Sequence, residues 1–213
     1  MSAKFRYLKI PYGENLLALL GSQGMIENDQ TMEMDHFHNL MEIAICRTGS
    51  GFVCIDDKRV TYQKDDVLVI PKNFSHAIYS CPEEKSFWEY IYIKPSAVFE
   101  WFQEIDVRKK EKLLEEIEYR PFLKSKKEVQ TLVTELDLIM DQHRLKEYEY
   151  KNCTNGLLTA LLVEISRINH LDLEKPEYEK KVSPKKVETL SWALDYIEEN
   201  FAKDLRISDI SQA

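Results

Sequence analysis

The hydrophobic period of the sequence changes near residue 94, and this change constrains the fold more than any other feature. From residue 5 to residue 94 the chain contains short β-branched and aromatic runs, such as FVCI at 52–55, VLVI at 67–70 and FWEYIYI at 87–93. Turn-forming segments separate the runs, and Gly and Asp in them tolerate the positive φ of tight turns. Many short strands with turns between them predict an antiparallel sandwich or barrel.

After Lys94 the apolar residues recur with a helical period of about 3.6 residues. A first helical face is formed by Leu132, Val133, Leu136, Ile139 and Met140, and a second by Leu157, Leu158, Leu161, Leu162, Ile165 and Ile168. A shorter helix is expected at 97–105. The second face is a candidate dimer interface, but such stripes can equally pack within one subunit, and the pattern does not choose between them.

The end of the sequence has a different composition. Residues 174–185, EKPEYEKKVSPK, are charged and contain two prolines, which is typical of a linker. A new apolar helical face begins after them. We therefore expect four parts: a barrel at 1–95, a helical dimerisation region at 96–173, a linker at 174–185, and the start of a further helical domain at 186–213 that this chain does not complete.

Charge and composition exclude several classes of protein. The chain has 213 residues, of which 44% are hydrophobic, and a formal net charge of -8. The acidic excess is shared by both halves, so neither half is a basic surface for nucleic acid. No apolar run is long enough to span a bilayer or to serve as a signal peptide, which favours a cytoplasmic protein without a membrane partner. The four cysteines match no zinc motif.

The segment HFHNLMEIAICRTGSG carries the chemistry of the sequence. His36, His38 and Glu42 share parity, so on one strand their side chains would leave the same face. His76, near a later strand, could join them inside a barrel. Imidazoles and a carboxylate are a common ligand set for Zn, Fe, Mn or Ni, so a divalent metal is possible, although none is required.

The spacing of these residues resembles the two cupin motifs. His36, His38, Glu42 and Gly49 fit the first motif, and Pro71 and His76 fit the second. Asp65 and Asn73 stand where the second motif has glycines, and Gln30 stands where a glycine precedes the first His. The positions of the candidate ligands are therefore kept, whereas some turn glycines are not.

The order of the parts also resembles AraC-type transcription regulators. The stretch DDVLVIP before His76 is similar to their sensor domain, and VETLSWALDYIEENFAKDLRISDIS is similar to the opening of their double helix-turn-helix domain. The resemblance implies an α+β chain: a cupin-like antiparallel β-barrel of jelly-roll type, a helical dimerisation region, and the first helices of a truncated helix-turn-helix domain. It implies a homodimer that contacts DNA only through the missing C-terminal domain, because the family's DNA-reading helices follow this point.

Three interpretations of the His36, His38, Glu42 and His76 set stay open: a metal site, a pocket for a small-molecule effector such as a sugar, and a polar network satisfied within the chain. Trp88, Tyr90 and Tyr92 share one face of the last strong strand and are candidates to line the effector pocket or to form core. No phosphate loop, nucleophile elbow or dinucleotide fingerprint indicates an enzyme. The alternative function is a metal-dependent cupin enzyme, a dioxygenase or isomerase.

Overall fold

The computed structural model describes residues 3–27, 35–55, 58–82, 84–101 and 106–173, with a few single positions between 193 and 208. The chain divides into two compact units, Met1–Lys180 and Lys181–Ala213. Most of the second unit lies outside the described residues. The same holds for the expected linker at 174–185 and for nearly all of the expected helix-turn-helix segment at 186–213.

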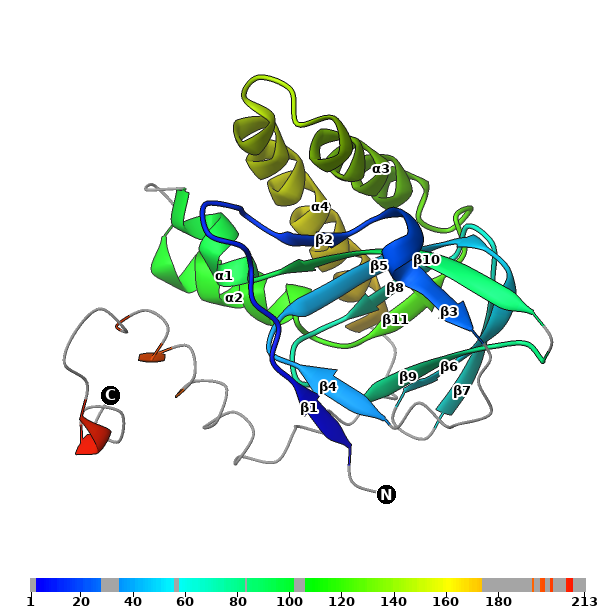
Figure 1. Cartoon of the computed structure of the whole chain (residues 1–213). Helices are drawn as coiled ribbons and strands as arrows, with labels where there is room; N and C mark the ends of the chain where they lie inside the picture. The colour runs from blue at the N-terminus through cyan, green and yellow to red at the C-terminus, as the bar shows by residue number, and fades with distance from the viewer. Residues whose placement is uncertain are drawn as a thin grey trace. The chain divides into compact units, whose positions relative to one another are not determined.

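Two β-sheets face each other in the first unit (Figure 1). The five-stranded sheet has the order β1 (Lys4–Arg6), β4 (His36–His38), β9 (His76–Ser80), β6 (Ser50–Ile55) and β7 (Lys58–Gln63). The six-stranded sheet has the order β11 (Phe122–Lys124), β8 (Val67–Ile70), β5 (Met41–Thr48), β10 (Lys85–Ile93) and β2 (Leu17–Leu19), with β3 (Met25–Glu27) also paired to β10. Neighbours are antiparallel except β1 and β4. The expected α+β fold with a cupin-like, jelly-roll type barrel is confirmed.

Two residues that replace motif glycines keep the backbone conformation of glycine. Asp65 has a φ of 71° and Asn73 a φ of 64°. Asp and Asn enter this left-handed region more readily than other residues with a side chain. The amide of Asp65 donates to the carbonyl of Cys46 at 2.8 Å, and that of Asn73 to the carbonyl of His38 at 2.8 Å. The turns of the barrel are therefore preserved despite the missing glycines.

The six-stranded sheet is buried on both faces, because side chains alternate between two separate cores. On β5, Ala44 and Cys46 face the barrel interior, whereas Ile43 and Ile45 face the helices. β8 and β10 divide in the same way. The interior core is completed by the other sheet through Val53, Ile55, Tyr62 and Ile78.

Helices cover the outer face of the six-stranded sheet (Figure 1). They are α1 (Pro95–Val98), the 3-10 helix η2 (Phe99–Trp101), α2 (Val107–Ile117), α3 (Gln130–Leu145) and α4 (Tyr150–Leu173); another 3-10 helix, η1 (Gly21–Gly24), follows β2. The two long helices agree with the sequence periodicity. α2 and β11 were not expected. Asp106 caps α2, since its side chain accepts from the amides of Arg108 and Lys109. No described helix is long and apolar enough to cross a membrane.

Candidate functional site

The residues of the HFHNLME segment lie on two strands of different sheets. His36 and His38 are on β4, and Glu42 is on β5, because the chain turns at Asn39 and Leu40. The side chain of Asn39 fixes this turn: it accepts from the amide of Leu8 at 2.8 Å and donates to the carbonyl of Leu8 at 3.0 Å. The expectation of a single strand with one common face is wrong. The three side chains meet because the two sheets face each other.

His76 reaches the same place by strand pairing, since it lies opposite His36 in the β4–β9 register. The ring centroids of His36 and His76 are 4.4 Å apart, and those of His38 and His76 are 5.1 Å apart. One ligand atom from each of the three imidazoles lies within 4.8 Å of the others. All three rings are buried, and so is the Glu42 carboxylate, whose residue is 1% exposed.

Backbone carbonyls orient two of the imidazoles. Nδ1 of His38 contacts the carbonyl oxygen of Leu40 at 2.7 Å, and Nδ1 of His76 contacts that of Phe74 at 3.0 Å. A carbonyl oxygen only accepts, so each Nδ1 carries the proton. Each Nε2 then points to the Glu42 carboxylate, with Nε2–Oε2 distances of 3.0 Å for His38 and 3.5 Å for His76.

Burial and mutual charge divide the protonation states of the cluster. Burial, followed by the charges of His76 and Arg6, lowers the pKa of His36 to about 3. Burial opposes charge on His76 and Glu42 as well, but their attraction outweighs it, so the pKa of His76 is raised and that of Glu42 is lowered. The cluster therefore favours the neutral form of His36 and the charged forms of His76 and Glu42.

Three polar atoms of the cluster have no hydrogen-bond partner: Nδ1 of His36, Oε1 of Glu42 and Nε2 of His76. Buried polar atoms of this kind are costly unless a ligand, ion or water satisfies them. Three imidazole nitrogens and a carboxylate oxygen also fit the donor set of a divalent transition metal. Two atoms bonded to one ion at about 2.1 Å lie at most about 4.2 Å apart, so the rings would have to close slightly around it.

An aromatic wall extends from the cluster along β10. Tyr92 lies edge-on to His38, with ring centroids 5.3 Å apart. Tyr90 stacks on Tyr92 at 6.1 Å and Trp88 on Tyr90 at 6.4 Å. All three rings belong to the interior core, and the residues are at most 8% exposed. The shared face predicted for them agrees with the structure, and they line the interior beside the cluster.

Arg6 is a neighbour of the cluster that sequence reasoning missed. It pairs with His38 in the β1–β4 register, and its charge acts on His36, His76 and Tyr92. The residue itself is exposed. No motif marks it, because only the parallel pairing of the N-terminal strand brings this guanidinium to the site.

The candidate dimer residues of α4 lie in the core of the chain itself. Leu158, Leu161, Leu162 and Ile165 are 0% exposed, and Leu157 and Ile168 pack partly buried against the same core. The expectation left packing within one subunit open, and these side chains follow that alternative.

Two facing sheets with a buried histidine and carboxylate cluster between them and helices on one wall form the domain that carries the candidate site. The family model described as AraC-like ligand binding domain matches residues 25–149. This match covers more than half of the sequence, and the chain belongs to this family. The expected relation to AraC-type regulators is confirmed.

Several solved structures are similar to this chain at low sequence identity. ToxT from Vibrio cholerae is similar with a TM-score of 0.50 and 9% identity, covering 92% of this chain and 70% of that chain. Unsaturated fatty acid bound wild-type ToxT from strain SCE256 has a TM-score of 0.44 and 14% identity, covering 82% of this chain and 60% of that chain. The AraC-like transcriptional activator CuxR has a TM-score of 0.36 and 13% identity, covering 81% and 55%. The chain thus spans 60% of the length of the fatty acid-bound ToxT chain. No curated protein matches the sequence significantly.

Proposed function

We propose that the chain is the effector-sensing part of an AraC-type transcription regulator and binds a small organic molecule inside the barrel. The observation that carries the proposal is that Nδ1 of His36 and Oε1 of Glu42 are buried without a hydrogen-bond partner beside His76, in an interior lined mainly by apolar side chains. A molecule with hydroxyl or carboxyl groups would satisfy them, while Tyr90 and Tyr92 would stack on its body. Arg6 at the rim favours an effector with a negative or strongly polar group.

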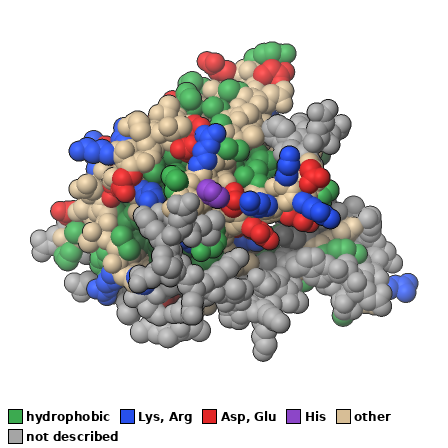
Figure 2. Space-filling view, turned by 180° about the vertical axis from the view of Figure 1, so that it is seen from behind, with side chains coloured by type: hydrophobic (Ala, Val, Ile, Leu, Met, Phe, Trp, Pro, Cys, Tyr) green, Lys and Arg blue, Asp and Glu red, His purple; other side chains and the backbone are tan. Residues whose placement is uncertain are grey.

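The proposal also includes control of a DNA-binding domain and dimerisation. The helix-turn-helix domain, with 186–213 as its start, would contact DNA, since the chain has a formal net charge of -8 and neither half of the sequence is basic. On the face drawn in Figure 2, Lys and Arg side chains alternate with Asp and Glu side chains instead of forming a basic patch. A dimer would use outward positions of α3 and α4, where Leu138 is 46% exposed, because the inward leucines of α4 are occupied.

A thermal-shift screen of sugars and small organic acids tests the effector site. A true effector raises the melting temperature of the wild-type chain, because a ligand that binds only the folded state stabilises it. We expect the shift to disappear in the His36→Ala, His38→Ala double variant and to shrink in Arg6→Gln for an acidic effector. A shift that survives the double variant would place the ligand elsewhere and contradict the proposal.

A divalent metal at the cluster is the second candidate, and the orientation of His38 and His76 favours it. Ligating imidazoles commonly donate their other ring N–H to a backbone carbonyl, as both rings do here. Elemental analysis of protein purified without nickel or chelator tests this candidate. Near-stoichiometric metal that is lost in the His36→Ala, His38→Ala variant would establish the site and favour the cupin enzyme alternative. Absence of metal from both proteins would exclude it.

A further inference from the structure

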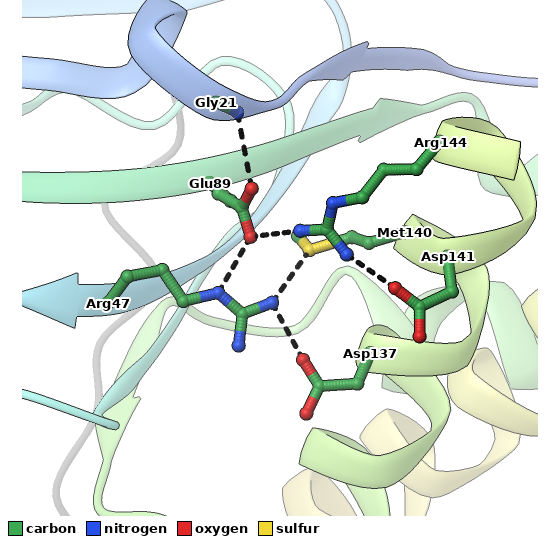
Figure 3. Close-up of polar contacts among 7 residues, drawn as sticks. All are labelled: Gly21, Arg47, Glu89, Asp137, Met140, Asp141 and Arg144. Atoms are coloured by element: carbon green, nitrogen blue, oxygen red, sulfur yellow. Dashed lines mark hydrogen bonds and ion pairs between the residues drawn. The ribbon is translucent and has the colours of Figure 1, made fainter.

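A buried carboxylate on the outer face of the barrel joins three parts of the chain (Figure 3). Glu89 of β10 accepts hydrogen bonds from Nε of Arg47 on β5 at 2.7 Å and from Nη2 of Arg144 on α3 at 2.5 Å, both at Oε2. Its Oε1 accepts from the amide of Gly21 at 3.2 Å, at the turn after β2. The Glu89 side chain is 6% exposed.

Both guanidinium groups are also held by α3 itself. Nη2 of Arg47 lies 2.6 Å from Oδ1 of Asp137, and Nη1 of Arg144 lies 2.6 Å from Oδ1 of Asp141 (Figure 3). Without Glu89, the positively charged guanidinium groups of Arg47 and Arg144 would face each other between α3 and the sheet. The carboxylate therefore fixes the C-terminal half of α3 against β5 and β10 in one register.

Elsewhere in the described part of the chain, the sheet packs against the helices mainly through apolar side chains. Ile43, Ile45, Ile91 and Ile93 present branched aliphatic groups to the helices. Apolar contacts are non-directional, so a helix can shift on them by small steps at little cost. Hydrogen bonds to charged groups depend strongly on distance and angle and are costly to leave unmade when buried. A movement of β10 is thus transmitted to α3 mainly at Glu89.

The position of Glu89 on β10 links this contact to the interior. Its neighbours in sequence, Trp88 and Tyr90, point to the opposite face and line the barrel next to the proposed effector site. A ligand that displaces these rings moves the backbone that carries Glu89. A ligand shifts the equilibrium between two arrangements of a protein only if it binds one of them more tightly than the other. A directional contact such as that of Glu89 is needed to distinguish two positions of α3.

We propose that Glu89, with Arg47 and Arg144, is the coupling residue through which the state of the barrel interior sets the position of α3. This inference rests on the proposed effector site for its biological use, but its test needs no effector. A change of the interior wall, Tyr90→Leu, replaces the ligand as the perturbation. Hydrogen exchange of the amides at 137–145 in the full chain reports on α3.

In the wild-type background, Tyr90→Leu should accelerate exchange at 137–145 on the order of threefold to tenfold. Glu89→Gln should accelerate it alone, and adding Tyr90→Leu to Glu89→Gln should produce no further change. Arg144→Gln, at a half-exposed position, should abolish the transmission in the same way and serves as the second variant if Glu89→Gln folds poorly. Lys72→Ala, which breaks the exposed 3.3 Å pair of Lys72 with Glu118, is the matched control and should leave the effect of Tyr90→Leu intact.

The coupling role would be overturned if Tyr90→Leu accelerated exchange at 137–145 equally with Glu89 present and with Glu89→Gln. It would also be overturned if Tyr90→Leu left the exchange of α3 unchanged in the wild-type chain. Failure to find any effector would overturn the proposed function and leave this result standing. The two inferences are therefore tested separately.

Discussion

Nε2 of His38 lies 3.0 Å from Oε2 of Glu42, although the two residues belong to strands of opposite sheets. The carboxylate also attracts His76 of the five-stranded sheet at 3.5 Å. Glu42 is thus a polar connection across the barrel interior at the end where the two sheets approach through the Asn39 turn.

Replacing Glu42 tests how strongly this connection stabilises the barrel. Glu42→Leu should lower the free energy of unfolding by about 1–3 kcal/mol, because it removes the hydrogen-bond partner of Nε2 of His38 and the carboxylate charge 3.5 Å from Nε2 of His76. Glu42→Gln should cost less, since its side-chain oxygen can still accept a hydrogen bond and only the negative charge is lost. Urea denaturation measures both, with Glu115→Leu on the exposed side of α2 as a control near zero. A Glu42→Leu chain as stable as wild type would show that the ion pair contributes nothing net.

Replacing Leu161 tests whether this residue of α4 occupies a core position or a position at a dimer interface. Because it is 0% exposed within one chain, Leu161→Ala should lower the free energy of unfolding by about 2–5 kcal/mol. Leu171→Ala, at a residue 70% exposed, should change it by less than about 0.5 kcal/mol. Thermal or urea unfolding combined with sedimentation makes the comparison. A Leu161 variant that keeps its stability and only loses self-association would place this side chain at an interface.

Because Asp65 has a positive φ, glycine and alanine should differ in stability at this half-buried position. Asp65→Gly should be tolerated, whereas Asp65→Ala should be less stable than Asp65→Gly by about 1 kcal/mol, because a Cβ in the left-handed region is strained. The same pair at exposed Lys64, which has no positive φ, should favour alanine or show no difference. Melting temperatures of the four variants are sufficient, and a reversed order at residue 65 would contradict the turn geometry.

The four free thiols should react at different rates with iodoacetamide. Burial, followed by the charge of Asp66, raises the pKa of Cys46 to about 12, so its thiolate is scarce at neutral pH. Exposed Cys153 should be alkylated first and Cys46 only on unfolding, as read by peptide mass spectrometry after timed quenching. Cys153→Ser identifies the fast phase. Rapid modification of Cys46 in the folded chain would show that the interior core opens to solvent.

The contribution of Glu89 to stability should depend on pH in a defined direction. Burial opposes the charge of Glu89, but the hydrogen bonds from Arg144 and Arg47 outweigh it and lower its pKa below the usual 4.5. A carboxyl group with a lowered folded-state pKa stabilises fully above its unfolded value and loses this contribution as pH falls through the folded value. The stability difference between wild type and Glu89→Gln should therefore be constant above about pH 5 and shrink below about pH 4. Urea unfolding at pH 7, 5 and 3.5 measures it, and a difference that grows on acidification would contradict the assigned charge.

The strands and long helices could be predicted because their apolar residues follow periods that local structure imposes. β5 and β10 are nearly continuous apolar runs because each of their faces packs into a core, and α3 and α4 carry continuous apolar faces. α2 was missed because its sequence, VRKKEKLLEEI, is mostly charged and only Ile117 is buried. The three-residue strands β1, β2, β3 and β11 lack a periodic signal, since their existence depends on pairing with distant strands.

The residues of the candidate cluster could be predicted from the sequence, but the strands that bring them together could not. Motif spacing identifies His36, His38, Glu42 and His76, while the break between β4 and β5 depends on the contact of Asn39 with Leu8, which is distant in sequence. Arg6, Arg47, Glu89 and Arg144 escaped for a related reason. Each is an ordinary charged residue in the sequence, and only tertiary pairing gives it a partner.

The alternation of side chains along β5 and β10 has a consequence for how this domain can change. Even-numbered positions of these strands face the barrel interior, and odd-numbered positions face the helices, so substitutions in the two sets are nearly independent. Substitutions of Ala44, Tyr90 or Tyr92 can therefore alter the interior while the helix contacts keep their residues. Glu89 is the exception, because it reports on both sets at once, and a redesigned barrel that retains it would keep a means of communicating with α3.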